Sequence, residues 1–127
     1  MGLRPDSLIL DCAEPLRVAR FWAAALDWEL DPDSDESDAY VKDPSGRSAG
    51  IFCQTVPEPK IAKNRMHLDV RPTGSMQEEV DRLLGLGATV RGFIEQDGSF
   101  WTQMRDVEGN EFCVLRGPKD GWTPGEL

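Results

Sequence analysis

The sequence has little of what nucleic-acid binding and membrane insertion require. Its 127 residues carry 14 Lys and Arg against 23 Asp and Glu, a formal net charge of −9. Because phosphate backbones are bound by clustered cations, we expect no nucleic-acid partner. No apolar run approaches the roughly 20 residues of a membrane span, and residues 1–6 lack the apolar stretch of a signal peptide. We therefore expect a cytoplasmic protein with no membrane partner.

Cysteine and histidine are also scarce. The three cysteines, Cys12, Cys53 and Cys113, are odd in number and each lies in a predicted strand. This pattern favours reduced, buried thiols over a disulfide framework. His67 is the single histidine, so any imidazole chemistry has to come from this position.

What the sequence does contain is a repeat. Residues 7–54 and 67–113 each read as a strand, an amphipathic helix, two strands joined by a glycine turn, and a last strand ending in Phe-Cys. The same spacing separates Ser7 from Asp27 and His67 from Gly87. A duplicated half-domain usually makes a cleft between its copies, so the repeat indicates where chemistry should lie.

The first copy predicts one helix and three longer strands. The helix begins at Glu14-Pro15, and its apolar face is expected to comprise Leu16, Ala19, Trp22, Ala23 and Leu26. The acidic segment 31–38 lacks the glycine and distal Glu of a calcium loop and is predicted to be a solvated loop. The strands are expected at residues 7–12, 39–43 and 49–55.

The second copy follows a proline-rich connector. Ser75 and Glu78 form a predicted capping box that opens the second helix, which should end at Gly85 and Gly87. Trp122 in the tail is expected to anchor that segment. The apolar positions of the helix are Met76, Val80, Leu83, Leu84 and Leu86, and the strands are predicted at residues 65–71, 88–95, 99–105 and 111–116.

This order resembles the vicinal oxygen chelate superfamily, which includes glyoxalase I, bleomycin resistance proteins, extradiol dioxygenases and fosfomycin-resistance enzymes, and most of all its glyoxalase-like subgroup. The stretches that carry the resemblance are residues 17–26, 63–70 and 106–113. It implies an α+β fold of two tandem βαβββ units, whose curled mixed sheets enclose a cavity and carry helices on the convex side. It also implies a homodimer and one glyoxalase-like domain over residues 1–127, with half-units at about 7–55 and 65–116, a connector at 56–64 and a tail at 117–127.

Metal-dependent members of this superfamily place one ligand on the first and one on the last strand of each unit, where the metal polarises substrate oxygens. Ser7, His67, Cys53 and Cys113 occupy these positions by spacing. Serine is a weak ligand, and two cysteines favour zinc over iron, manganese or nickel. Cys113 stands where the family has a glutamate. We therefore expect the usual metal set to be missing, with a Cys2His zinc site as the alternative.

Strand alternation predicts a second group of residues, because positions i and i+2 share a face. If His67 faces the cavity, Asp69 and Arg71 do so too, while Met66, Leu68 and Val70 pack under the helix. Pairing across residues 106–110 sets Arg105 opposite Glu111, Gln103 opposite Cys113 and Trp101 opposite Leu115. The expected ligand-binding residues are His67, Asp69, Trp101, Gln103, Glu111 and Cys113.

Their chemical roles stay open. His67 and Asp69 are the candidate catalytic pair, with the carboxylate supporting the imidazole as a general base, although a hydrogen-bonded wall residue is the alternative. His67 and Glu111 are candidate ligands of a divalent metal, but Glu111 can instead pair with Arg105. Two functions follow. One is a glyoxalase-like protein that binds a small organic molecule in a cavity between the βαβββ units, without the usual metal set. The other is a metal-dependent lyase, isomerase or dioxygenase of the vicinal oxygen chelate superfamily.

Overall fold

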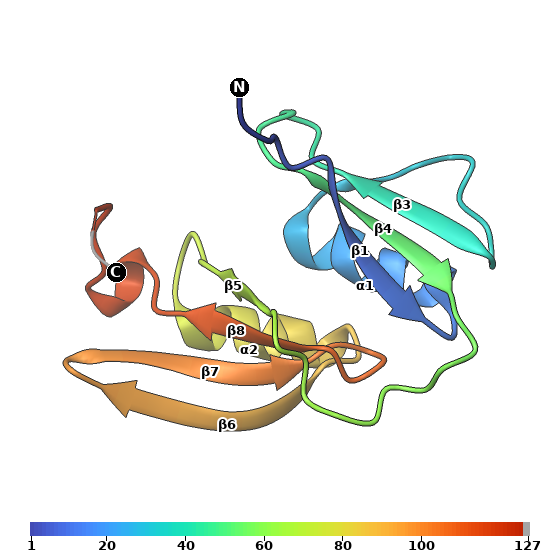
Figure 1. The fold of residues 1–127 in the computed structure, drawn as a ribbon. Helices are drawn as coiled ribbons and strands as arrows, with labels where there is room; N and C mark the ends of the chain where they lie inside the picture. The colour runs from blue at the N-terminus through green and yellow to red at the C-terminus, as the bar shows by residue number, and fades with distance from the viewer. Residues whose placement is uncertain (126–127) are drawn as a thin grey trace. The chain divides into compact units, whose positions relative to one another are not determined.

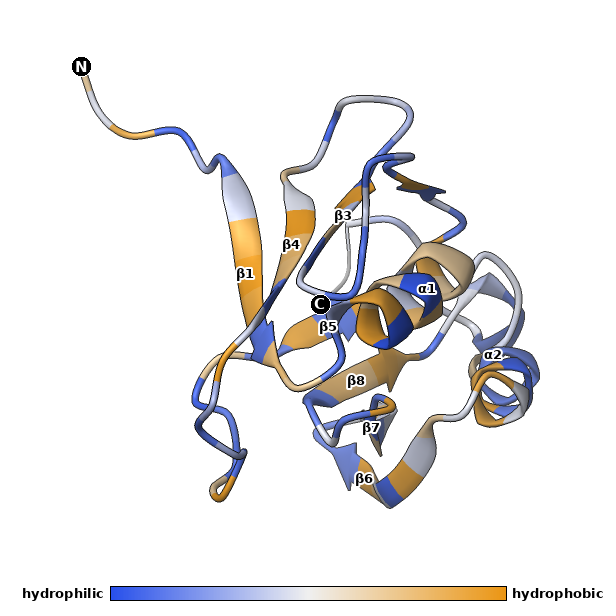
Figure 2. Ribbon diagram, turned by 90° about the vertical axis from the view of Figure 1, so that its right-hand side faces the viewer, coloured by the Kyte–Doolittle hydropathy of each residue, from blue (hydrophilic) through white to orange (hydrophobic). Residues whose placement is uncertain are grey.

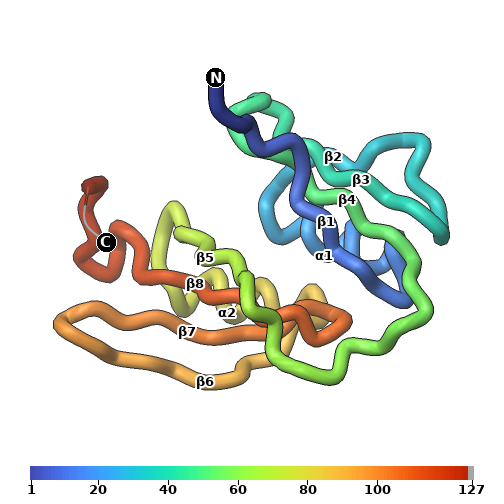
Figure 3. Tube along the Cα trace, in the orientation of Figure 1, coloured from blue at the N-terminus to red at the C-terminus, as the bar shows by residue number. Residues whose placement is uncertain are grey.

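The computed structural model describes residues 1–125. The chain divides into two compact units, Met1–Ile61 and Ala62–Leu127. Within the described chain each unit has one α-helix and one four-stranded mixed sheet, drawn as ribbons in Figure 1. The expected α+β class, with two tandem βαβββ units, is confirmed. Figure 3 follows the chain between them as a green segment that joins β4 to β5.

Unit 1 contains α1 (Pro15–Leu26) and a sheet of order β1-β4-β3-β2. Among residues 1–125 the two outer strands of this sheet pair on one side only, so the sheet is open. β1 runs parallel to β4, and β3 pairs with β4 in the antiparallel sense. The strands are β1 (Ser7–Cys12), β2 (Glu29–Leu30), β3 (Asp38–Lys42) and β4 (Gly50–Thr55).

Helix α1 forms where proline and a left-handed residue bracket an amphipathic stretch. Pro15 occupies the first turn, and Asp27 ends the helix with a φ of 55°. The buried side chains are Pro15, Val18, Ala19, Phe21 and Trp22. The sequence placed the apolar face slightly wrong, because Leu16, Ala23 and Leu26 are only half-buried. In Figure 2 apolar and polar residues colour different sides of both helices.

Unit 2 contains α2 (Met76–Gly85) and a sheet of order β5-β8-β7-β6. Ser75 caps the helix as the predicted capping box requires, since its Oγ accepts a hydrogen bond from the Glu78 N–H at 3.1 Å. Met76, Val80 and Leu83 are buried against the sheet, whereas Leu84 and Leu86 are exposed. The strands are β5 (Leu68–Val70), β6 (Thr89–Gln96), β7 (Ser99–Arg105) and β8 (Glu111–Leu115).

Strand β5 is shorter than the sequence predicts. The segment before it does not join the ladder, because the Asn64 N–H donates to the Glu111 carboxylate at 2.9 Å instead. His67 therefore precedes β5 and Arg71 follows it. Met66 is 81% exposed, so the expectation that it packs under the helix is wrong.

The predicted register of the last hairpin is confirmed at all three positions. Trp101 pairs with Leu115, Gln103 with Cys113, and Arg105 with Glu111. β6 continues the sheet antiparallel to β7, with an irregularity between Val90 and Gly92. The rows of the unit 2 sheet are thus in register from β5 through β8 to β7, and the register shifts within β6.

The C-terminal segment is anchored to unit 2. A short 3-10 helix, Pro118–Asp120, places the Asp120 carboxylate against the start of α2. Beyond it, the guanidinium carbon of Arg71 lies 4.1 Å from the centre of the Trp122 ring. The expectation that Trp122 anchors the tail is confirmed.

All three cysteines are buried and free of disulfides, as the sequence predicts. Cys12 and Cys53 lie in unit 1 and Cys113 in unit 2. Over residues 1–125, no helix combines the length and apolar character needed to cross a bilayer.

Candidate functional site

A pocket of about 530 Å³ lies within unit 2. Its walls come from β7, β8 and the region of β5, and every wall residue has an odd number, as expected for one face of an aligned sheet. The residues that line it are His67, Asp69, Arg71, Ser99, Trp101, Gln103, Cys113 and Leu115.

The pocket face is the one that α2 does not cover. The even-numbered residues of the same strands, Met104, Phe112 and Val114, are buried in the core. Thr102 donates from Oγ1 to the sulfur of Met76, which ties that face to the first turn of α2. The helix therefore covers one side of the sheet and leaves the odd-numbered side to form the pocket, as strand alternation predicts.

Strand register arranges the pocket in rows. One row is polar, because Asp69 pairs with Cys113 and Cys113 pairs with Gln103. The next row is apolar in its centre, where Leu115 pairs with Trp101. A ligand in this pocket meets hydrogen-bonding groups and an aromatic surface side by side.

His67, Asp69 and Cys113 converge at one end of the pocket. His67 Nδ1 lies 3.7 Å from Asp69 Oδ1, too long for a hydrogen bond but close enough for an ion pair when the imidazole is protonated. One potential ligand atom from each of the three residues lies within 4.8 Å of the others. The structure thus brings together both candidate catalytic residues and adds a thiol to them.

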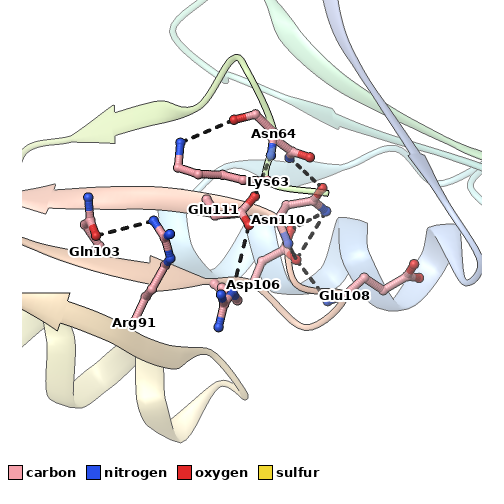
Figure 4. A network of polar contacts seen from close by, with 9 residues as sticks. Lys63, Asn64, Arg91, Gln103, Asp106, Glu108, Asn110 and Glu111 are labelled. Carbon is pink, nitrogen blue, oxygen red and sulfur yellow. Dashed lines mark hydrogen bonds and ion pairs between the residues drawn. The ribbon is translucent and has the colours of Figure 1, made fainter. Parts of the chain in front are cut away.

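Burial raises the pKa of the Cys113 thiol from 9.0 to about 11, and the charge and hydrogen bond of Asp69 act in the same direction. The positive charges of Lys63 and Arg91 oppose this shift. Figure 4 shows both cations on this part of unit 2, with Arg91 turned toward the Gln103 side chain. Cys113 is therefore a protonated thiol at neutral pH unless a cation displaces its proton.

Glu111 lies outside this group. Its carboxylate is 7% exposed, accepts the Asn64 N–H at 2.9 Å and lies 3.8 Å from Arg105 Nε. The Asn64 side chain also donates to Asn110 at 2.9 Å, so the segment before β5 is fixed to the last hairpin (Figure 4). In the structure Glu111 lies next to Arg105, which is one of the two alternatives that the sequence left open. It is not among the residues that converge with His67.

The matching Phe-Cys pairs of the two units are not equivalent. Cys53 is fully buried on the side of its sheet that packs against α1, together with Ile51 and Val41. Cys113 faces the pocket on the opposite side from α2. The two copies are offset by one residue, and a one-residue offset exchanges the faces of a strand. Cys53 therefore cannot take the place in a metal site that the resemblance implies for it.

Three residues that line the pocket were not among the ligand-binding residues expected from the sequence. Ser99 and Leu115 continue the odd-numbered faces of β7 and β8, so alternation applied two residues further would have found them. Arg71 was predicted to face the cavity, and it does, but its position gave no sign of the contacts that hold its side chain.

The chain resembles known proteins over both of its units. The sequence profile of the glyoxalase-like domain matches residues 7–115. No curated protein matches the sequence significantly. Among solved structures, a mutant FosX fosfomycin resistance protein of Listeria monocytogenes, in complex with Mn(II) and 1S,2S-dihydroxypropylphosphonic acid, is similar with a TM-score of 0.73. It is 13% identical, over 92% of each chain.

Two further structures share the fold. A glyoxalase/bleomycin resistance protein/dioxygenase family enzyme of Burkholderia phytofirmans has a TM-score of 0.69 at 12% identity, over 86% of this chain and 94% of its own. The bleomycin-binding protein of Streptomyces verticillus, in complex with copper(II)-bleomycin, has a TM-score of 0.61 at 13% identity, over 92% and 98%. The neighbours share the fold, and the profile match shows that the chain belongs to the glyoxalase-like domain family.

Proposed function

We propose that the protein binds a small organic molecule in the pocket of unit 2. The observation that carries this proposal is a pocket of about 530 Å³ in which an indole side chain and several polar groups face the same space. Ligand sites are typically concave, about 300–1,000 Å³ in volume, and combine apolar walls with a few orienting polar groups. Trp101 and Leu115 provide the apolar wall here, and Asp69 and Gln103 provide polar groups.

The structural neighbours support this proposal because two of them are complexes with non-protein ligands. One of them is a complex with copper(II)-bleomycin and another is a complex with a small phosphonic acid. For this chain we propose that His67 and Asp69 contact the bound molecule, as an acid–base pair if the protein is a catalyst. We further propose that both units form one glyoxalase-like domain, and that the protein acts as a cytoplasmic homodimer.

Native mass spectrometry of the purified protein tests binding directly. We expect ligands to be retained by the wild type and lost from Trp101→Ala, because the variant removes the largest apolar wall of the pocket. Phe93→Ala is the matched control, since Phe93 is an exposed aromatic residue on β6 that pairs with Thr102 and so faces away from the pocket. Retention of every ligand by Trp101→Ala would place binding elsewhere.

A metal site is a second candidate, favoured by the convergence of His67, Asp69 and Cys113. The usual family set does not fit, because Cys53 lies in the core of unit 1. The three converging residues do fit zinc, whose sites combine imidazole, thiolate and carboxylate ligands and leave a fourth position open when they are catalytic. A bound zinc ion would act as a Lewis acid toward a ligand oxygen. His67, Asp69 and Cys113 would hold it.

Titration of metal-free protein with Co²⁺ tests this candidate, because a cobalt–thiolate bond has a characteristic absorption band. We expect the band in the wild type and its loss in Cys113→Ser. Glu111→Gln is the informative control. It should leave the band unchanged if the three converging residues form the site, and weaken or abolish it if Glu111 is also a ligand. A wild type that binds Co²⁺ without the band would contradict a site containing Cys113.

A further inference from the structure

The pocket wall contains one permanently charged side chain that is fixed in position. Arg71 lines the pocket, and its Nη1 donates to the Arg116 carbonyl at 2.7 Å. The guanidinium also stacks on the Trp122 ring, with its carbon 4.1 Å from the ring centre. A guanidinium held by both a hydrogen bond and an aromatic face is oriented before any ligand arrives, so little side-chain entropy is lost on binding.

The charged side chains at and near the pocket are mostly positive, although the whole chain is acidic. The protein carries a formal charge of −9. In contrast, Arg71 lies in the wall, and Lys63 and Arg91 are close enough to act on Cys113, while the lining contains the single carboxylate of Asp69. An acidic protein repels anions at long range, so a local excess of cations at one pocket is the arrangement that attracts an anionic ligand there.

The neighbours of Arg71 on the sheet define what else the ligand carries. Arg71 directly follows β5, two residues after Asp69 and on the same face of the sheet. This position places it beside the row of Leu115 and Trp101. A flat apolar body fits against the surface that Trp101 and Leu115 form together. Asp69 and Gln103, one row away, suit a hydrogen-bond donor on the opposite part of the ligand, where the Asp69 charge does not repel the anionic group.

We propose that the pocket recognises a flat, apolar carboxylate, with its carboxylate on Arg71 and its ring against Trp101 and Leu115. This inference rests on the proposed small-molecule binding and adds the ligand's chemical class. Trp122 is a positioning residue in this scheme, because it acts on the ligand only through Arg71.

A pair of isosteric probes tests the proposal. Calorimetry with 2-naphthoate and its uncharged amide, 2-naphthamide, compares two ligands that differ in charge but share the ring. We expect the wild type to bind the acid about tenfold or more tightly than the amide, the difference made by a charge-assisted hydrogen bond. Arg71→Gln should remove this preference, so that acid and amide bind the variant equally.

Two control variants separate charge from geometry. Arg20→Gln, an exposed arginine on α1, should keep the full preference for the acid. Trp122→Leu should weaken the binding of the acid more than that of the amide, because it releases Arg71 without removing its charge. If Arg71→Gln does not fold, Arg71→Lys replaces it, and a partial loss of the preference is expected since lysine lacks the planar fork.

The outcomes distinguish the two proposals. Equal binding of acid and amide to the wild type would overturn the assignment of a carboxylate and retain the binding pocket. Binding of neither probe would count against both. A preference for the acid that survives in Arg71→Gln would show that another cation holds the anion and would overturn the role of Arg71.

Discussion

The Asp120 carboxylate accepts a hydrogen bond from the Met76 N–H at 2.7 Å and a second from the Gly117 N–H at 2.8 Å. Met76 is the first residue of α2, so the carboxylate from the C-terminal segment satisfies a donor that the helix itself leaves unpaired. It also places a negative charge at the positive end of the helix. A segment outside the βαβββ repeat thereby completes the capping of α2.

We therefore predict that Asp120→Ala lowers the free energy of unfolding by about 1–2 kcal/mol. Asp120→Asn should lower it less, because the amide oxygen can accept the same bonds without the charge. Urea unfolding followed by circular dichroism measures both values. Glu58→Ala, an exposed carboxylate in the connector, is the control and should change stability by less than about 0.5 kcal/mol.

A second prediction concerns Glu111, which accepts the Asn64 N–H and faces Arg105. Glu111→Ala should lower the free energy of unfolding by roughly 1–3 kcal/mol, because it leaves the Asn64 N–H without its acceptor. Arg105 is partly exposed, so water compensates its lost partner. Denaturant unfolding gives the change in stability. Glu111→Gln keeps an acceptor and should recover most of the loss, and an equal loss in both variants would contradict the role of the Asn64 bond.

A third prediction compares two glycines of unit 2. A side chain at Gly117 would collide with the Gly74 carbonyl oxygen, whereas one at Gly92 would meet no atom within 4 Å. Gly117→Ala should therefore destabilise the protein by about 1–3 kcal/mol. Gly92→Ala should be neutral or stabilise it by up to about 1 kcal/mol, since alanine restricts the unfolded chain. Thermal unfolding of the two variants side by side measures the contrast, and similar effects of both would contradict it.

Alternation within one strand was predictable from the sequence, but alignment between the two copies was not. Phe112 and Cys113 were assigned correctly to opposite faces because successive side chains of a strand point to opposite sides of the sheet. Cys53 was misplaced because the repeat was aligned on the identical Phe-Cys letters, and no sequence signal marks the one-residue offset. The offset is set by how each strand is paired with its neighbours, which is a tertiary property.

The polar contacts of the site were less predictable than its faces. The strand expected over 65–71 is shortened because Asn64 bonds to Glu111, a residue far along the chain. The orientation of the Arg71 side chain likewise depends on residues far along the chain, Arg116 and Trp122. Such long-range side-chain contacts have no periodic signal, so a pattern of apolar residues cannot reveal them.

The last prediction concerns pH, through the raised pKa of Cys113. Burial disfavours the thiolate, so the folded state keeps its proton to about pH 11 while the unfolded thiol loses it near its ordinary value of 9.0. Between these values the unfolded state binds fewer protons, and stability falls as pH rises. We expect the wild type to lose more stability than Cys113→Ser between pH 9.0 and about 11, and to lose no more than the variant below that range.

Alkylation by iodoacetamide, located by peptide mass spectrometry, checks the same shift independently. The rate at Cys113 should be low at neutral pH and rise toward pH 11. Asp69→Asn should increase the rate at a given pH, because the Asp69 charge and hydrogen bond hold the thiol in its protonated form. Gln103→Ala serves as the control, since it opens the same row of the pocket without removing a charge. If Gln103→Ala accelerated the reaction as much as Asp69→Asn, access rather than the charge of Asp69 would set the reactivity of Cys113.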